Sequence, residues 1–153
     1  MLTNELGIDA LTCHALIGHN IYMHCDNLLM LAEMSCEGTL INADYVHRAL
    51  DPIINRWNIF DNVSGVICQN IGVKYLRDNK CINDIITMSP GVNISTSIDT
   101  INQRYTTYLD NPMKTRELLG QFWIVGRGIY ESCDRTASAK QYAELGWEHF
   151  KNY

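Results

Sequence analysis

Apolar side chains recur every three or four residues over much of this chain, which is the spacing of helices that bury one face. The clearest such stretch is 43–57, and Asn42 just before it is a candidate N-cap. Pro52 lies inside this stretch and lacks a backbone donor, so it predicts a kink or a junction between two shorter helices. Weaker helical patterns predict further helices at 9–24, 69–79, 114–126 and 136–150.

Three short segments have the composition of strands. Residues 63–68 form an apolar, β-rich run typical of a buried strand, and 82–88 is a second candidate. In 92–101 apolar and polar residues alternate, which predicts a strand with one buried face. The sequence Ser-Pro-Gly at 89–91 is a turn signal between the last two segments. Because helices and strands need not alternate strictly in this pattern, it favours the α+β class.

The composition is that of one ordinary globular domain. The chain has 153 residues, of which 46% are hydrophobic and 19% are charged, and it carries a net charge of −5. An acidic chain without a dense Lys/Arg run is a poor candidate for nucleic-acid binding. There is no apolar run of about 18 residues, the length of a membrane span, and no basic N-terminal region typical of a signal peptide. We therefore expect neither a membrane nor a nucleic acid as a partner.

Cysteines and histidines near the N-terminus are the first candidates for metal binding. The six cysteines of the chain are irregularly spaced and lack a Cys-x-x-Cys pair, so we expect them to be reduced and mostly buried. His14, His19 and His24 recur every five residues, a spacing that turns them to different faces of a helix. This spacing favours capping or solvent-facing histidines over zinc or copper ligands.

The familiar motifs for nucleophilic catalysis and phosphate binding do not occur in the sequence. There is no Gly-x-Ser-x-Gly elbow, no Walker loop and no Gly-x-Gly-x-x-Gly. Gly126-Arg127-Gly128 is too short to cradle a phosphate. We interpret it as glycine at the C-terminal end of the helix predicted at 114–126.

The C-terminal stretch 144–150 places His149 among carboxylates and aromatic residues. A histidine ligand, a glutamate that accepts a proton from metal-bound water and an aromatic shield are the parts of a metal-hydrolysis site. The alternative is a histidine near the end of a helix, flanked by packing aromatics, and composition alone favours it. For the helix at 136–150 we expect Thr136 or Ser138 near the N-cap, and Tyr142, Leu145 and His149 along one side.

Several short motifs occur in an order that resembles a known family. Residues 29–39, 49–54 and 63–66 are similar to a leading segment, a proline-containing helix and the end of a Ser-Gly strand, in that order. Residues 97–99 lie where a zinc-binding motif of the family ends, and 147–150 match its C-terminal Glu-His motif. The family is that of the zinc D-alanyl-D-alanine carboxypeptidases and their phage endolysin relatives, which have the hedgehog-like peptidase fold.

The resemblance implies a particular architecture. The fold would be α+β, with a small antiparallel sheet flanked by helices. Residues 1–153 would form a single domain, in which 1–27 are an N-terminal extension and 28–150 are the peptidase-like core.

The resemblance also implies a metal site, which this chain matches only in part. Asp99 and His149 would be zinc ligands, and Glu148 or Glu144 would be the general base if the protein is active. Val92 stands where the family has its first histidine ligand. Two protein ligands bind zinc poorly and do not hold the geometry that activates water.

The resemblance therefore favours a peptidase-like scaffold that has lost its zinc site. We expect a non-catalytic structural or binding component of a phage particle, in the tail, the baseplate or the head decoration. Its partners would be other protein subunits, either further copies of itself or virion proteins. It would need no cofactor, and it would be located in the virion or the host cytoplasm.

Two alternatives remain open at this level. One is a working zinc-dependent peptidoglycan peptidase of the endolysin type, with zinc as its cofactor and peptidoglycan as its partner. The other is a small host-takeover inhibitor that binds one partner through an exposed apolar patch. Whether the protein is an enzyme is thus left undecided by its sequence.

Overall fold

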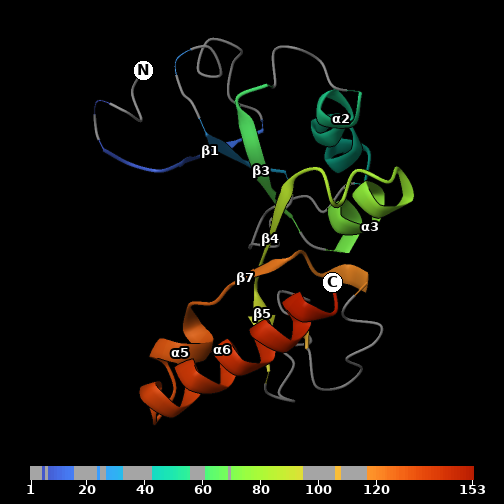
Figure 1. The fold of residues 1–153 in the computed structure, drawn as a ribbon. Coiled ribbons are helices and arrows are strands. Elements are labelled where there is room, and N and C mark those ends of the chain that lie inside the picture. The colour runs from blue at the N-terminus through green and yellow to red at the C-terminus, as the bar shows by residue number, and fades with distance from the viewer. Residues whose placement is uncertain are drawn as a thin grey trace.

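The computed structural model describes residues 5, 7–15, 24, 27–32, 43–55, 61–68, 70–94, 106–107 and 117–153. Its centre is a five-stranded sheet in which every neighbouring pair of strands runs parallel (Figure 1). The strands lie side by side in the order in which they occur along the chain. They are β1 (Leu11–His14), β2 (Leu28–Leu31), β3 (Val63–Ile67), β4 (Ile86–Pro90) and β7 (Phe122–Ile124).

Helices make the connections between the central strands. Helix α2 (Ala43–Ile54) joins β2 to β3, and α3 (Asn70–Asp78) joins β3 to β4. Parallel neighbours require crossovers of this kind, because each strand must start at the same edge of the sheet. The two helices lie next to each other on one side of the sheet (Figure 1). This alternation of strand and helix defines an α/β fold.

One apolar cluster holds these two helices against the sheet. Val46 and Leu50 of α2 and Val73 and Leu76 of α3 have at most 1% of their surface exposed. Burial of one such side chain contributes about 1.5–3 kcal/mol. The other buried members of the cluster lie in strands, directly after strands, or between α3 and β4: Met30, Ala32, Val66, Cys68 and Ile82.

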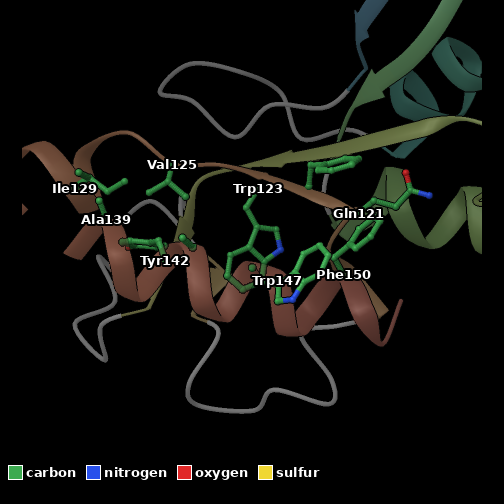
Figure 2. A pocket seen from close by; sticks show the side chains of 11 residues that line it. Gln121, Trp123, Val125, Ile129, Ala139, Tyr142, Trp147 and Phe150 are labelled. Atoms are coloured by element: carbon green, nitrogen blue, oxygen red, sulfur yellow. The ribbon is translucent and has the colours of Figure 1, made fainter. Parts of the chain in front are cut away.

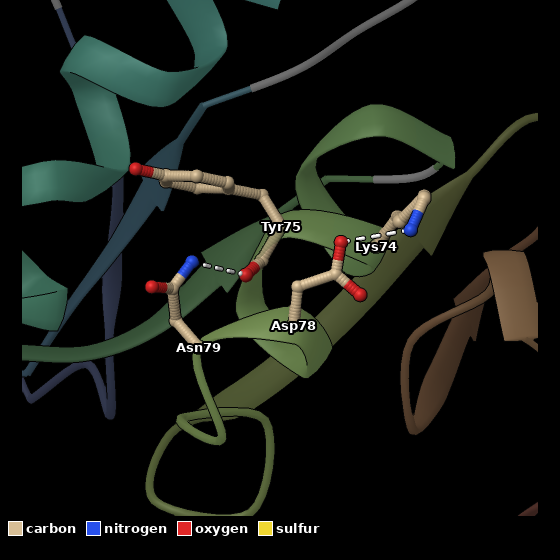
Figure 3. A network of polar contacts seen from close by, with 4 residues as sticks. All are labelled: Lys74, Tyr75, Asp78 and Asn79. Carbon is tan, nitrogen blue, oxygen red and sulfur yellow. Dashed lines mark hydrogen bonds and ion pairs between the residues drawn. The ribbon is translucent and has the colours of Figure 1, made fainter.

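Polar contacts stabilise the C-terminal end of α3 (Figure 3). Asn79 Nδ2 donates to the carbonyl of Tyr75 at 2.9 Å, and Lys74 Nζ pairs with Asp78 Oδ2 at 2.7 Å across one turn. The exposed ion pair contributes only a few tenths of a kcal/mol. Lys80 then takes a positive φ of 59°, which reverses the chain toward β4.

The C-terminal part of the chain builds a second cluster on the last strand. After β7 come the short helix α5 (Arg127–Tyr130) and the long helix α6 (Arg135–Lys151), which packs across β7 (Figure 1). A two-stranded parallel pair, β5 (Val92–Asn93) with β6 (Thr106–Thr107), adjoins them. The buried members of this second cluster are Val92, Ile94, Leu119 and Tyr142.

Several elements expected from the sequence are confirmed. The helices predicted at 43–57, 69–79 and 136–150 are α2, α3 and α6, and the strand predicted at 63–68 is β3. Helix α2 continues through Pro52 and ends two residues later, so the proline lies in its last turn. The N-cap of α6 is Asp134, whose side chain accepts from the Ala137 amide, and not Thr136 or Ser138.

The predicted α+β class with a small antiparallel sheet is wrong, because all the strand pairs described are parallel. The helices predicted at 9–24 and 114–126 are wrong where β1 and β7 occur. Both strands have only three or four residues, too few for a period to separate strand from helix. The strand expected at 82–88 begins only at Ile86 and takes in two residues of the predicted turn.

Some of the expectations concern residues that lie outside the described ones. Asn42 and residues 95–101 of the predicted strand at 92–101 lie outside them.

Strand β1 belongs to the sheet, so the segment expected to be an N-terminal extension contributes one of its strands. Within the part of the chain that the structure describes, no helix is long and apolar enough to cross a membrane.

Candidate functional site

All strands of the sheet end at the same edge, because they are parallel. The segments that leave this edge begin with Ala32 after β2, Cys68 after β3, Gly91 after β4 and Val125 after β7. In parallel α/β sheets and barrels, ligands bind at the carboxyl ends of the strands, where such segments converge. This edge is therefore the first place to look for a functional site.

The loop after β7 comprises Val125, Gly126 and the first two residues of α5, Arg127 and Gly128, and it carries a cation between two glycines. Gly126 precedes α5, and its carbonyl accepts from the amides of Ile129 at 2.9 Å and Tyr130 at 3.2 Å. The side chain of Arg127 is exposed. Among the described residues within three positions of a strand's carboxyl end, Arg127 is the only charged one. A guanidinium presents several donors in a fixed plane, which suits it to phosphate or carboxylate.

Side chains of α6 contact Gly128 and its neighbours and fix the position of this loop. A Cβ at position 128 would overlap the hydroxyl of Tyr142, so only glycine fits against this side chain. Ser138 Oγ donates to the Gly128 carbonyl at 2.8 Å, and Arg135 Nε donates to the Tyr130 carbonyl at 2.9 Å. The loop is thus fixed by three side chains from one helix.

The loop after β4 reaches the same helix. Gly91 takes a positive φ of 68°, a conformation that glycine adopts without strain, and this turns the chain from β4 into β5. The amide of Ile94, which follows β5, donates to the hydroxyl of Tyr142 at 3.3 Å. The loops after β4 and β7 therefore meet at one tyrosine.

A separate apolar groove lies between β7 and α6 (Figure 2). It has a volume of about 580 Å³, and no charged residue lines it. Trp123 and Val125 from the strand side and Trp147 and Phe150 from the helix side lie along it (Figure 2). Trp147 is 61% exposed. The groove lacks the charged groups that a polar reaction or a phosphate needs, so we place the candidate site at the carboxyl edge instead.

The residues predicted from the sequence as a zinc site do not converge in the part of the chain described. His149 is fully buried, and its Nε2–H donates to the Gly120 carbonyl at 2.8 Å. Glu148 pairs with Lys151, and Glu144 lies 4.0 Å from Lys140; both carboxylates are exposed. Asp99 lies outside the described residues.

The N-terminal candidates also remain apart in the described part of the chain. Cys13 is buried in β1, whereas His14 and His24 are exposed. His19 lies outside the described residues. No group of three or more His, Cys, Asp and Glu side chains among the described residues could hold a metal ion.

Sequence reasoning missed the glycine-flanked arginine. We interpreted Gly126-Arg127-Gly128 as the end of a helix, but Gly126 follows a strand and precedes α5. The run Phe-Trp-Ile-Val before it is apolar, aromatic and β-branched, and these features were the available signal for a short strand.

The fold and this edge together define a class: a parallel α/β sheet with its strands in chain order, as in (β/α)₈ barrels, and a candidate site at their carboxyl ends. Solved structures agree. Orotidine 5'-monophosphate decarboxylase from Sulfolobus solfataricus covers 97% of this chain with a TM-score of 0.59 at 16% identity, and 66% of that structure is matched. The enzyme from Pyrococcus horikoshii OT3 gives a TM-score of 0.60 at 20% identity, covering 98% of this chain and 64% of its own.

Sequence comparison identifies the family. Residues 2–142 match the orotidine 5'-phosphate decarboxylase / HUMPS family, and this chain belongs to it. It is 32% identical over 124 residues to orotidine 5'-phosphate decarboxylase from Penicillium chrysogenum, covering 80% of this chain and 42% of that enzyme. It is 33% identical over 126 residues to uridine 5'-monophosphate synthase from Naegleria gruberi, covering 81% of this chain and 23% of that protein. The chain thus spans less than half the length of these curated relatives.

The family assignment corrects the resemblance drawn from short motifs. The chain is not a D-alanyl-D-alanine peptidase, and the phage structural role, the peptidoglycan peptidase and the host-takeover inhibitor all lose their support. The motif at 147–150, which we matched to a metal motif, is part of α6, and its histidine is buried in the protein interior. The short motifs on which the peptidase resemblance was based led to the wrong family, because each of them also fits an ordinary helix or strand end.

Proposed function

We propose that this chain binds orotidine 5'-phosphate as part of an orotidine 5'-phosphate decarboxylase. The observation that carries the proposal is the match of residues 2–142 to this family, together with a parallel sheet whose carboxyl edge carries Arg127. Because the chain spans 42% of the Penicillium chrysogenum enzyme, the activity of the whole enzyme is itself part of the proposal.

The loops after β4 and β7 are suited to the phosphate of this nucleotide. In (β/α)₈ barrels the loops after the last two strands frequently form a phosphate-binding site, and β4 and β7 are the last two strands of this sheet. Arg127 supplies the positive charge, and Gly126, which has largely open space where a side chain would stand, lets a phosphate approach the backbone closely.

Decarboxylation requires both binding of the nucleotide and donation of a proton to its ring, and different residues can meet these two requirements. The bond between the pyrimidine ring and its carboxylate breaks, carbon dioxide leaves, and the electron pair that remains on the ring carbon takes up a proton. This gives uridine 5'-monophosphate. Arginine stays protonated at all accessible pH values, so Arg127 binds the nucleotide and does not supply the proton. We therefore assign nucleotide binding, rather than proton transfer, to the described edge.

Calorimetric titration with uridine 5'-monophosphate and with orotidine 5'-phosphate tests the proposal. The Arg127→Ala variant should bind both ligands about 10- to 100-fold more weakly, which is the worth of a charge-assisted hydrogen bond to phosphate. Arg48→Ala, which removes an exposed arginine on α2, is the matched control and should bind like the native chain. Absence of binding by the native chain, or equal affinity in Arg127→Ala, would overturn the proposal.

A further inference from the structure

Tyr142 occupies a position that packing alone does not require. Its ring belongs to the apolar cluster beneath α6, and only 5% of the residue is exposed. Figure 2 shows the ring reaching from α6 toward Val125 and Ile129. A phenylalanine would fill the same volume, so the hydroxyl is the feature that needs an explanation.

That hydroxyl touches both loops of the proposed phosphate site. It accepts a hydrogen bond from the Ile94 amide at 3.3 Å, on the segment that follows β4 and β5. It also fills the space beside the Cα of Gly128, on the loop that follows β7. One atom therefore touches the segments that follow two different strands.

Ser138, one turn before Tyr142 on the same helix, fixes the orientation of the second loop. Its Oγ donates to the Gly128 carbonyl at 2.8 Å. Because the carbonyl is held, the peptide plane that follows Gly128 is held with it, and its amide at Ile129 is directed to the Gly126 carbonyl at 2.9 Å. Arg127 lies between these two anchored glycines.

We propose that Tyr142, with Ser138, is a positioning residue that holds the loops after β4 and β7 at the separation needed to bind the nucleotide phosphate. This inference rests on the proposed function. It states that α6 acts on the phosphate through the two loops without touching the ligand. The expected signature is a loss of affinity that is confined to ligands carrying a phosphate.

The experiment compares uridine 5'-monophosphate with uridine, which lacks the phosphate, by ligand-observed NMR titration of the full chain. Tyr142→Phe should weaken binding of the nucleotide about 5- to 10-fold, the effect of one neutral hydrogen bond. Binding of uridine should change less than about 2-fold. Ser138→Ala should weaken nucleotide binding in the same direction, and it remains informative if Tyr142→Phe does not fold.

Tyr130→Phe is the matched control. It removes a tyrosine hydroxyl from α5, beside the same loop, but this side chain is 53% exposed. It should leave the affinity for both ligands unchanged.

The outcomes separate the two proposals. If the native chain does not bind uridine 5'-monophosphate, the proposed function fails and this inference fails with it. If the native chain binds but Tyr142→Phe and Ser138→Ala bind the nucleotide as tightly, the inference alone is overturned. An equal loss of affinity for nucleotide and uridine also overturns it, because that result describes a general structural role.

Discussion

His149 provides the sharpest test of the packing described for α6. The side chain is fully buried and donates from Nε2 to the Gly120 carbonyl at 2.8 Å. Its ring lies 5.2 Å from that of Trp123 and 5.7 Å from that of Tyr153, measured between centroids. The substitution His149→Phe keeps an aromatic ring of similar size and removes the donor.

The expected loss follows from these contacts. Leaving a buried acceptor without its donor costs about 1–3 kcal/mol, so His149→Phe should lower the free energy of unfolding by that amount. His149→Ala also removes the ring, and truncation of a buried aromatic side chain typically costs about 3–5 kcal/mol. The alanine variant should therefore be the less stable of the two.

Urea denaturation measures both values. With a slope of about 1–3 kcal/mol per molar urea for a chain of this size, a loss of about 2 kcal/mol moves the midpoint by roughly 1 M. Glu148→Gln is the control: it changes an exposed neighbour of His149 and should alter stability by less than about 0.5 kcal/mol. A native midpoint for His149→Phe would refute the reasoning. A chelator that lowered the native midpoint to that of His149→Ala would show that a metal, not the Gly120 bond, stabilises this site.

Three other substitutions address separate parts of the fold. Asp134→Ala removes the N-cap of α6 and should lower the free energy of unfolding by about 1 kcal/mol, whereas Asp134→Asn should retain most of it; urea midpoints of both decide this. Gly65→Ala would place a methyl group 2.7 Å from Leu29 Cδ2, and such overpacking should cost about 1–3 kcal/mol. A native melting temperature for that variant would contradict the close contact of β2 and β3. Burial raises the pKa of Tyr153, so the folded protein keeps the phenol proton to higher pH than the unfolded chain, and stability should fall as pH rises above about 10. Urea midpoints across that range should fall less steeply for Tyr153→Phe, and an identical pH dependence would exclude Tyr153 as the cause.

Long amphipathic elements were predictable from the sequence. Helices α2, α3 and α6 each have enough residues to show the helical period, and strand β3 is a compact apolar run. Strands β1 and β7 are too short to show a period, and their apolar residues also fit the helical spacing of their surroundings.

Whether neighbouring strands run parallel or antiparallel cannot be predicted from the residues of each strand alone. It follows from the crossovers: β2, β3 and β4 are separated by helices, and strands joined in this way are parallel. The alternation was visible around residues 63–79, but β1 and β7 both lie in segments predicted as helices, so the series was too short to indicate an α/β fold. The pattern therefore favoured the α+β class, and the resemblance to the peptidases added the antiparallel sheet.

The candidate site was missed for the same reason. Gly126 after a helix indicates a C-cap, whereas Gly126 after a parallel strand indicates a loop at the functional edge. Tyr142 was predicted on one side of its helix together with Leu145 and His149, but its contact with Ile94 joins residues 48 positions apart, and no local pattern can reveal it.

The apolar cluster beneath α6 has a consequence for how the molecule opens. It shares no buried member with the cluster beneath α2 and α3. A unit with its own core can exchange its amide hydrogens through local opening while the remainder stays folded. The loops that meet at Tyr142 belong to this unit, so its opening would release the nucleotide that we propose binds there. Occupancy of the site would accordingly slow hydrogen exchange in α6 and leave exchange in α3 unchanged.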